Sequence, residues 1–143
     1  MLFQYDDGGR EAAGFSGKNA GDCVTRAICI ASGKPYFDIY VTINLLAKHE
    51  RTGCRKSGTS SANVGVYRTT YNKVLKQLGA KWVPTMGIGT GCKVHLRDGE
   101  LPMGKLVASV SKHLVAVIDG VIHDTFDCSR DGTRCVYGYW ILP

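Results

Sequence analysis

A cysteine stands where the sequence predicts the start of a helix. In the segment NAGDCVTRAICIASGKP, residues 19–35, the spacing predicts a helix from Cys23 to Ser32, with Asp22 as its N-cap and Gly33 as its stop. The apolar residues of this segment recur three and four positions apart, at Val24, Ala27, Ile28 and Ala31. Free amide N–H groups and the helix dipole at such a start favour a thiolate over a thiol. Cys23 is therefore a candidate nucleophile for attack on a carbonyl, and the alternative is a small buried residue without chemical function.

A cysteine nucleophile needs a base, and the hairpin in the second half of the chain offers one. The segment HLVAVIDGVIHDTF, residues 113–126, predicts two strands joined by a two-residue type I′ turn at Asp119-Gly120. This turn pairs Ile118 with Val121, and the pairing continues outward from there. His113 and Asp124 then fall on one face of the hairpin, whereas His123 falls on the other.

The register makes His113 the candidate base and Asp124 the candidate acid that orients it. Asp127 is the second choice for the acid, because it falls on the wrong face. His49 is expected at the surface at the end of a helix, and His95 has no evident function.

The order of these residues resembles the papain-like cysteine peptidase superfamily. GDCVTRAICIASG, residues 21–33, is similar to its cysteine helix, and residues 113–126 are similar to its histidine and acid strands, notably in peptidases of the bacteriocin-processing type. GDCVTRA also resembles the GNC…RA segment of OTU-type deubiquitinases, and the whole chain resembles small papain-like proteins of bacteria and phages. The resemblance implies a thiol hydrolase with a triad of Cys23, His113 and Asp124 that acts on a peptide, isopeptide or side-chain amide of a protein.

The chain departs from the family pattern at the oxyanion hole. Many members carry a Gln about six residues before the cysteine, where this sequence has Gly17. Asn19, or the backbone N–H of Cys23, is the expected donor instead. Because the superfamily also includes deamidases, transglutaminases, acyltransferases and inactive members, two alternatives stay open. One is a deamidase or acyltransferase with the same triad, and the other is a non-catalytic binding or inhibitor protein, such as a phage-encoded inhibitor of a host factor.

The remaining pattern predicts helices first and strands last, so we expect one α+β domain over residues 1–143, with N-terminal helices packed on a C-terminal antiparallel sheet. Helices are expected from Pro35 and around residues 67–78, with a loop at 58–65 between them. The region after residue 80 holds only short extended pieces. The strands lie within 105–126, followed by a turn at 129–134 and a last strand at 135–140.

Composition favours a cytoplasmic globular protein that begins at its own Met1. The formal charge is +6, but the basic residues are scattered, which favours solubility over nucleic-acid binding. No apolar run approaches a membrane span, and no signal peptide precedes the domain. The six cysteines are therefore expected to be reduced thiols. CKVH, residues 92–95, is only half a zinc motif, so no metal or cofactor is expected, and the expected partner is a protein or peptide substrate.

Overall fold

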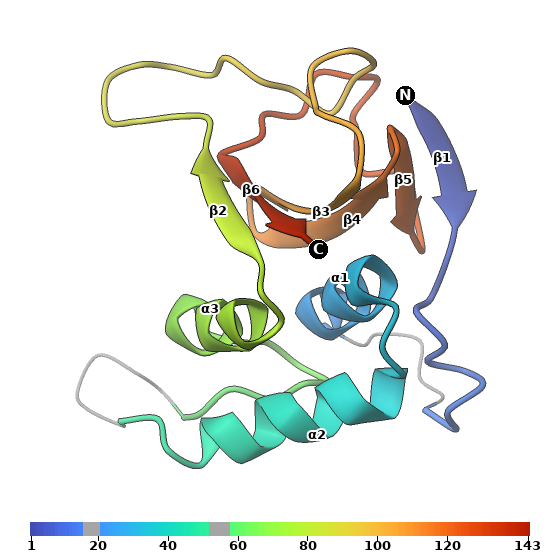
Figure 1. Ribbon diagram of the computed structural model, residues 1–143, viewed down its shortest axis with the longest axis vertical. Helices are drawn as coiled ribbons and strands as arrows, with labels where there is room; N and C mark the ends of the chain where they lie inside the picture. The colour runs from blue at the N-terminus through green and yellow to red at the C-terminus, as the bar shows by residue number, and fades with distance from the viewer. Residues whose placement is uncertain (16–20, 52–57) are drawn as a thin grey trace.

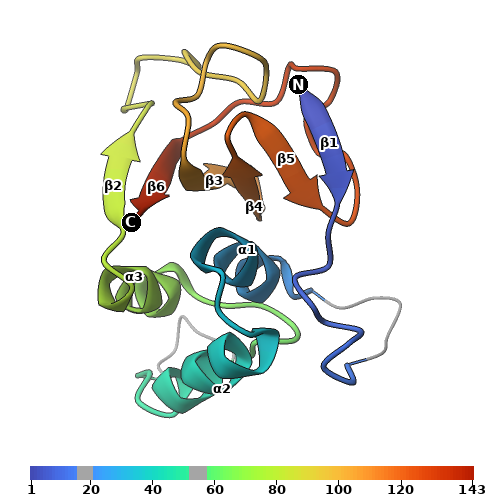
Figure 2. The same cartoon turned by 45° about the vertical axis from the view of Figure 1, so that its right-hand side comes forward.

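A mixed sheet and three helices make up the computed structural model, which describes residues 1–15, 21–51 and 58–143 (Figure 1). This architecture is α+β. The helices cover one side of the sheet, with α1 directly against it (Figure 2). In chain order the elements are β1 (Leu2–Tyr5), α1 (Cys23–Ser32), α2 (Tyr36–Ala47), α3 (Arg68–Gln77), β2 (Lys81–Pro84), β3 (Lys105–Val110), β4 (His113–Ile118), β5 (Val121–Asp124) and β6 (Gly138–Leu142).

The expectation of a purely antiparallel sheet was wrong at one edge. The strand order is β1-β5-β4-β3-β6-β2, and β1 pairs with β5 in the parallel direction, Leu2 opposite Val121. All four residues of β1 are exposed, so this edge strand lacks the alternating burial that marks a strand in sequence. It is held by backbone pairing, which no side-chain pattern reveals.

The predicted hairpin register is confirmed. Ile118 pairs with Val121 and Val117 with Ile122, and both turn residues have positive φ, 47° for Asp119 and 81° for Gly120, as a type I′ turn requires. The two faces of β4 enter two separate cores. Leu114 and Ala116 pack with the helices, whereas Val115 and Val117 pack on the far face.

The far face of the sheet is covered by long loops rather than helices, which is why it carries a second core. Leu96 and Leu101, from the connection between β2 and β3, are buried there with Cys128 and Val136. This glycine-rich connection therefore contributes core residues without forming helices or long strands.

A disulfide joins Cys92 to Cys135, so the expectation that all six cysteines are reduced was wrong. A backbone β-bridge between His95 and Cys135 brings the segments that hold the two bonded cysteines side by side. The Cα atoms of Cys92 and Cys135 are 5.9 Å apart. Neither sequence spacing nor composition reveals this proximity. Cys23, Cys29 and Cys128 are free thiols, and Cys54 lies outside the described residues.

The helices lie close to their expected positions, but the last strand is shifted. Pro35 precedes α2, α3 ends just before Gly79, and the last strand begins at Gly138 rather than at residue 135. A side chain at position 138 would collide with the Trp82 ring, because a Cβ there would lie 2.3 Å from it. Within the described residues, no helix has the length and apolar character needed to cross a membrane.

We predict that the disulfide stabilises the domain measurably. It closes a span of 43 residues, and such a cross-link stabilises a fold by about 2–4 kcal/mol through restriction of the unfolded chain. Cys92→Ala, Cys135→Ala and the double variant should lose the same free energy of unfolding in urea titrations, because each removes the same bond. Three unequal losses, or no loss on reduction of the parent protein, would contradict the prediction.

Candidate active site

The first turn of α1 positions Cys23, as the sequence predicted. The helix begins at Cys23 and ends at Gly33, whose φ of 73° allows the left-handed cap conformation. Asp22 does occupy the residue before the helix, but its side chain makes no capping hydrogen bond, so its expected function as a side-chain cap was wrong. Gly21 packs against the carbonyl of Val64, with room for no side chain, which brings the 61–65 turn up to the start of the helix.

His113 opens β4 and lies between Cys23 and Asp124. Its Nε2 is 2.6 Å from Asp124 Oδ2, so the carboxylate orients the ring. The start of β4 brings His113 and the backbone of Leu114 up to Cys23, and both lower the pKa of its thiol.

By strand alternation, His113 and Asp124 fall on the face of the sheet opposite the one that α1 covers. The side chains of Cys23, His113 and Asp124 nevertheless meet. The reason is their place at strand ends: His113 is the first residue of β4 and Asp124 the last of β5. The start of α1 reaches this end of the sheet, so Cys23 and Arg26 contact the two strand-end side chains directly. A position nearer the strand centre would bury either group in the far core.

Electrostatics at the site favours a thiolate–imidazolium pair. Burial alone would raise the pKa of the Cys23 thiol, but the hydrogen bonds from His113 and Leu114 and the positive charges of His113 and Arg26 bring it below its ordinary value. Burial alone would lower the pKa of His113, but hydrogen bonds with Asp124, Cys128 and Cys23 raise it to about 11. Both shifts transfer the proton from sulfur to nitrogen near neutral pH.

Asp124 is a buried carboxylate that stays ionised. Burial opposes its charge, but the hydrogen bond and charge of His113, the charge of Arg26 and the backbone N–H of Thr125 together hold its pKa below the ordinary value. Only 2% of the residue is exposed. Water therefore contributes little to its solvation, and its partners in the protein keep it charged.

Arg26 is a site residue that the sequence analysis missed. Its Nε and Nη2 both donate to Asp124 Oδ1, at 3.2 and 2.9 Å, and its Nη1 donates to Asp22. The Tyr36 hydroxyl donates to the other Asp22 oxygen at 2.7 Å. Arg26 lies outside the apolar stripe of α1, one turn after the cysteine, so the sequence pattern gave no signal that it is buried.

The other candidate residues lie away from this group. Asp127 is exposed, and its carboxylate accepts a hydrogen bond from the backbone N–H of Ser129 instead of orienting His113. His49 is exposed beyond the end of α2. His95 lies 3.6 Å from the bonded sulfur of Cys92 and 3.1 Å from Glu100. Asn19, the expected oxyanion donor, falls in 16–20 and lies outside the described residues.

Cys23 and His113 line a cleft of about 500 Å³. One wall is the loop that includes Val64 and Val66, another is α3 with Tyr71, and the floor includes Leu114 of β4. A thiol and an imidazole in contact at the side of such a cleft are accessible to a substrate of peptide size.

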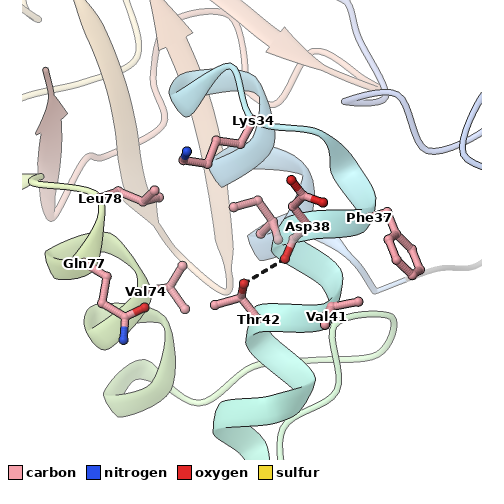
Figure 3. A pocket seen from close by; sticks show the side chains of 9 residues that line it. Lys34, Phe37, Asp38, Val41, Thr42, Val74, Gln77 and Leu78 are labelled. Atoms are coloured by element: carbon pink, nitrogen blue, oxygen red, sulfur yellow. Dashed lines mark hydrogen bonds between the residues drawn. The ribbon is translucent and has the colours of Figure 1, made fainter.

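A second hollow of similar size lies between α2 and α3 and shares no lining residue with the Cys23 cleft (Figure 3). Figure 3 shows Lys34 and Asp38 at one end and the apolar Val74 and Leu78 at the other. Neither charged side chain contacts a nucleophile there. This hollow therefore offers no counterpart to the thiol and imidazole of the Cys23 cleft.

Comparison with family models, with curated proteins and with solved structures gave no match. The function must therefore be argued from the site itself.

We predict that Cys23 reacts with iodoacetamide well below pH ~8.5, the ordinary thiol value. Its lowered pKa keeps the thiolate populated as the pH falls, so reactivity should decline only in more acidic solution. His113→Asn removes the donor and positive charge that lower the Cys23 pKa, so the reactivity midpoint should move to higher pH. Peptide mapping by mass spectrometry assigns the modified thiol at each pH.

His123→Asn is the matched control, because this second hairpin histidine contacts Asp6 rather than the cysteine. Its pH profile should match that of the parent. An unchanged profile in His113→Asn would show that His113 does not activate Cys23.

We also predict that Arg26→Met destabilises the domain by about 3–5 kcal/mol, because it leaves buried carboxylates without their charge partner. Lys73→Met, on the exposed face of α3, should change the free energy of unfolding by no more than about 0.5 kcal/mol. Urea denaturation of both variants measures the difference. Equal stability of the two variants would show that Arg26 is not needed to neutralise the buried carboxylates.

Proposed function

We propose that this protein is a thiol hydrolase that acts on a peptide, isopeptide or side-chain amide of a protein through an acyl-enzyme on Cys23. One observation carries the proposal. A thiol at a helix start lies beside an imidazole whose Nε2 is 2.6 Å from a buried carboxylate, and thiol and imidazole line one cleft. Each member thus has the neighbour that its step in acyl transfer requires.

In the first half of the proposed reaction, the Cys23 thiolate attacks the carbonyl carbon of the substrate amide, and the C=O electrons move to oxygen. The resulting oxyanion needs hydrogen-bond donors, which the amides at the start of α1 and the Asn19 side chain would supply. The function of Asn19 stays a prediction. When the tetrahedral intermediate collapses, the imidazolium of His113 gives its proton to the leaving amine, and a thioester on Cys23 remains.

In the second half, water attacks the thioester carbonyl while neutral His113 takes up a proton from that water. The acid product leaves, and Cys23 and His113 return to the thiolate–imidazolium pair. Asp124 keeps the ring in the orientation that presents one nitrogen to the sulfur and stabilises the imidazolium at each stage. The reaction as a whole adds one water across the amide bond and requires no cofactor.

The arrangement supports the resemblance to papain-like peptidases. The cysteine comes from the first helix, the histidine from the start of a strand, and the acid from the neighbouring strand, in that chain order. All reactions of that superfamily share the acyl-enzyme step, so a deamidase or an acyltransferase would use these residues in the same way.

The cleft favours an apolar or aromatic group next to the scissile carbonyl. Val64, Val66 and Tyr71 line it together with Cys23, and so do the cationic Arg68 and Lys112. We therefore expect uncharged or acidic substrates to be preferred over basic ones.

We predict that Asp124 matters for the reaction of Cys23 and that Asp127 does not. An orienting carboxylate can contribute up to ~10⁴ in rate in serine triads, and a thiolate at a helix start depends on it less. Asp124→Asn should therefore slow modification of Cys23 by a peptide electrophile clearly, whereas Asp127→Asn should react at the parental rate. The second-order rate constants of the two variants are the measurement.

The Asp124→Asn and Asp127→Asn variants are well matched. Both carboxylates lie near the same end of the hairpin, and each substitution removes one negative charge. A slower Asp127→Asn variant would mean that the acid is misassigned. Parental rates in both variants would reduce the triad to a Cys23–His113 dyad.

A further inference from the structure

Cys128 is a buried thiol that the proposed reaction does not use, yet it lies beside the reacting groups. It follows β5 in the chain and is 1% exposed. One donor atom each of His113, Asp124 and Cys128 lie within 4.8 Å of one another. Imidazole nitrogen, carboxylate oxygen and thiol sulfur are the three ligand types that zinc sites combine.

We propose that a thiophilic divalent cation of the Zn²⁺ type binds at His113, Asp124 and Cys128 and reversibly blocks the base of Cys23. The binding does not depend on hydrolysis, whereas the block rests on the function proposed above. The expectation of no metal came from the absence of paired ligand spacing in sequence. This donor set instead forms through the fold, from a strand start, a strand end and the loop that follows.

The donor geometry suits a tetrahedral ion. Zinc bonds of about 2.0–2.3 Å place the donors of one ion roughly 3–4 Å apart, and the separations here fall within 4.8 Å. His113 Nε2 and Asp124 Oδ2, now 2.6 Å apart around a shared proton, need only a small separation to admit the ion between them. Three protein ligands would leave a fourth position open.

The surroundings already orient one of the ligands. Asp124 Oδ1 accepts hydrogen bonds from Arg26 Nη2 at 2.9 Å and from the backbone N–H of Thr125 at 2.7 Å, which directs Oδ2 toward His113. Hydrogen bonds to the second oxygen of a ligating carboxylate are a usual feature of metal sites. Binding displaces two protons, one from His113 Nε2 and one from the Cys128 thiol, so the sulfur bonds the ion as a thiolate.

The bound ion removes the base by fixing the imidazole tautomer. With the ion on Nε2, the neutral ring carries its remaining proton on Nδ1, the nitrogen that we assign to Cys23 in the proposed reaction. That nitrogen can donate a hydrogen bond but cannot accept the thiol proton. With the ion bound, His113 could neither give up that proton to a leaving amine nor take one up from water, so turnover of the acyl-enzyme would stop.

The binding test uses Cd²⁺ as a spectroscopic substitute for Zn²⁺ and the full-length Cys23→Ser variant with its disulfide intact. The thiolate-to-cadmium charge-transfer absorption should rise to one equivalent. Addition of Cys128→Ser should abolish the band and, in a competition titration with a coloured metal indicator, should weaken Cd²⁺ binding by at least the ~10–100-fold that loss of an outer-shell partner causes. Cys29→Ala, which removes another buried free thiol, is the matched control and should bind as Cys23→Ser alone does.

The outcomes of the binding test are decisive. Equal Cd²⁺ affinity with and without Cys128, or no charge-transfer band at all, would overturn the site. If Cys128→Ser unfolds the chain, as circular dichroism would reveal, Cys128→Ala on the same background repeats the test with a smaller, apolar side chain.

The block is tested separately, by the steady-state turnover of p-nitrophenyl acetate with and without Zn²⁺. Release of the acetyl group from Cys23 by water needs His113 as the base. The ratio of the two rates should fall in the parent and in Cys29→Ala, and it should stay near one in Cys128→Ser. An equal fall in Cys128→Ser would mean that Zn²⁺ acts directly on Cys23 and would refute the block. Because binding is measured without Cys23, a failure of the proposed hydrolysis leaves the binding result intact.

Discussion

The site depends on one buried carboxylate. Asp124 joins a strand end to the first helix, because one of its oxygens bonds His113 and the other bonds Arg26. A lone ionised carboxylate at 2% exposure would be strongly unfavourable, so its two cationic neighbours are a condition of its burial. The same bonds that make the charge tolerable also fix the imidazole ring relative to the start of α1.

Arg26 extends this constraint into the helical layer. Through Asp22 it connects to Tyr36, the first residue of α2, so a continuous polar chain runs from β4 to the second helix inside an otherwise apolar core. Such a chain can stabilise the fold only if every member is paired. Asp22, Cys23 and Arg26 lie within one turn at the start of α1, so the same contacts fix the position of this helix relative to the strands.

Much of the hairpin and the helix start could be predicted because both are governed by local chemistry. The Asp119-Gly120 turn sets the strand register, and the register alone puts His113 and Asp124 on one face. The cap at Asp22 was predicted wrongly for an instructive reason. A carboxylate before a helix is a good cap in isolation, but here it is buried against Arg26 and Tyr36, and these tertiary partners outweigh the local one.

What could not be predicted was set by contacts between distant segments. The disulfide between Cys92 and Cys135 and the parallel pairing of β1 with β5 join residues far apart in sequence, and neither leaves a local pattern. Arg26 and Cys128 were missed for the same reason, since each meets His113 or Asp124 only after folding. Sequence spacing thus indicated the group of Cys23, His113 and Asp124 but not the residues that surround it.

The most direct test of the account is the capture of the acyl-enzyme itself. The protein would be incubated with a peptide mixture from a cell lysate, quenched in acid, and mapped by mass spectrometry. The account predicts acyl adducts on Cys23 that hydroxylamine releases, with none on Cys29 or Cys128 and none in Cys23→Ser. An unmodified Cys23 across the mixture, under conditions in which iodoacetamide alkylates it rapidly, would contradict a catalytic function and leave a reactive thiol without acyl-transfer activity.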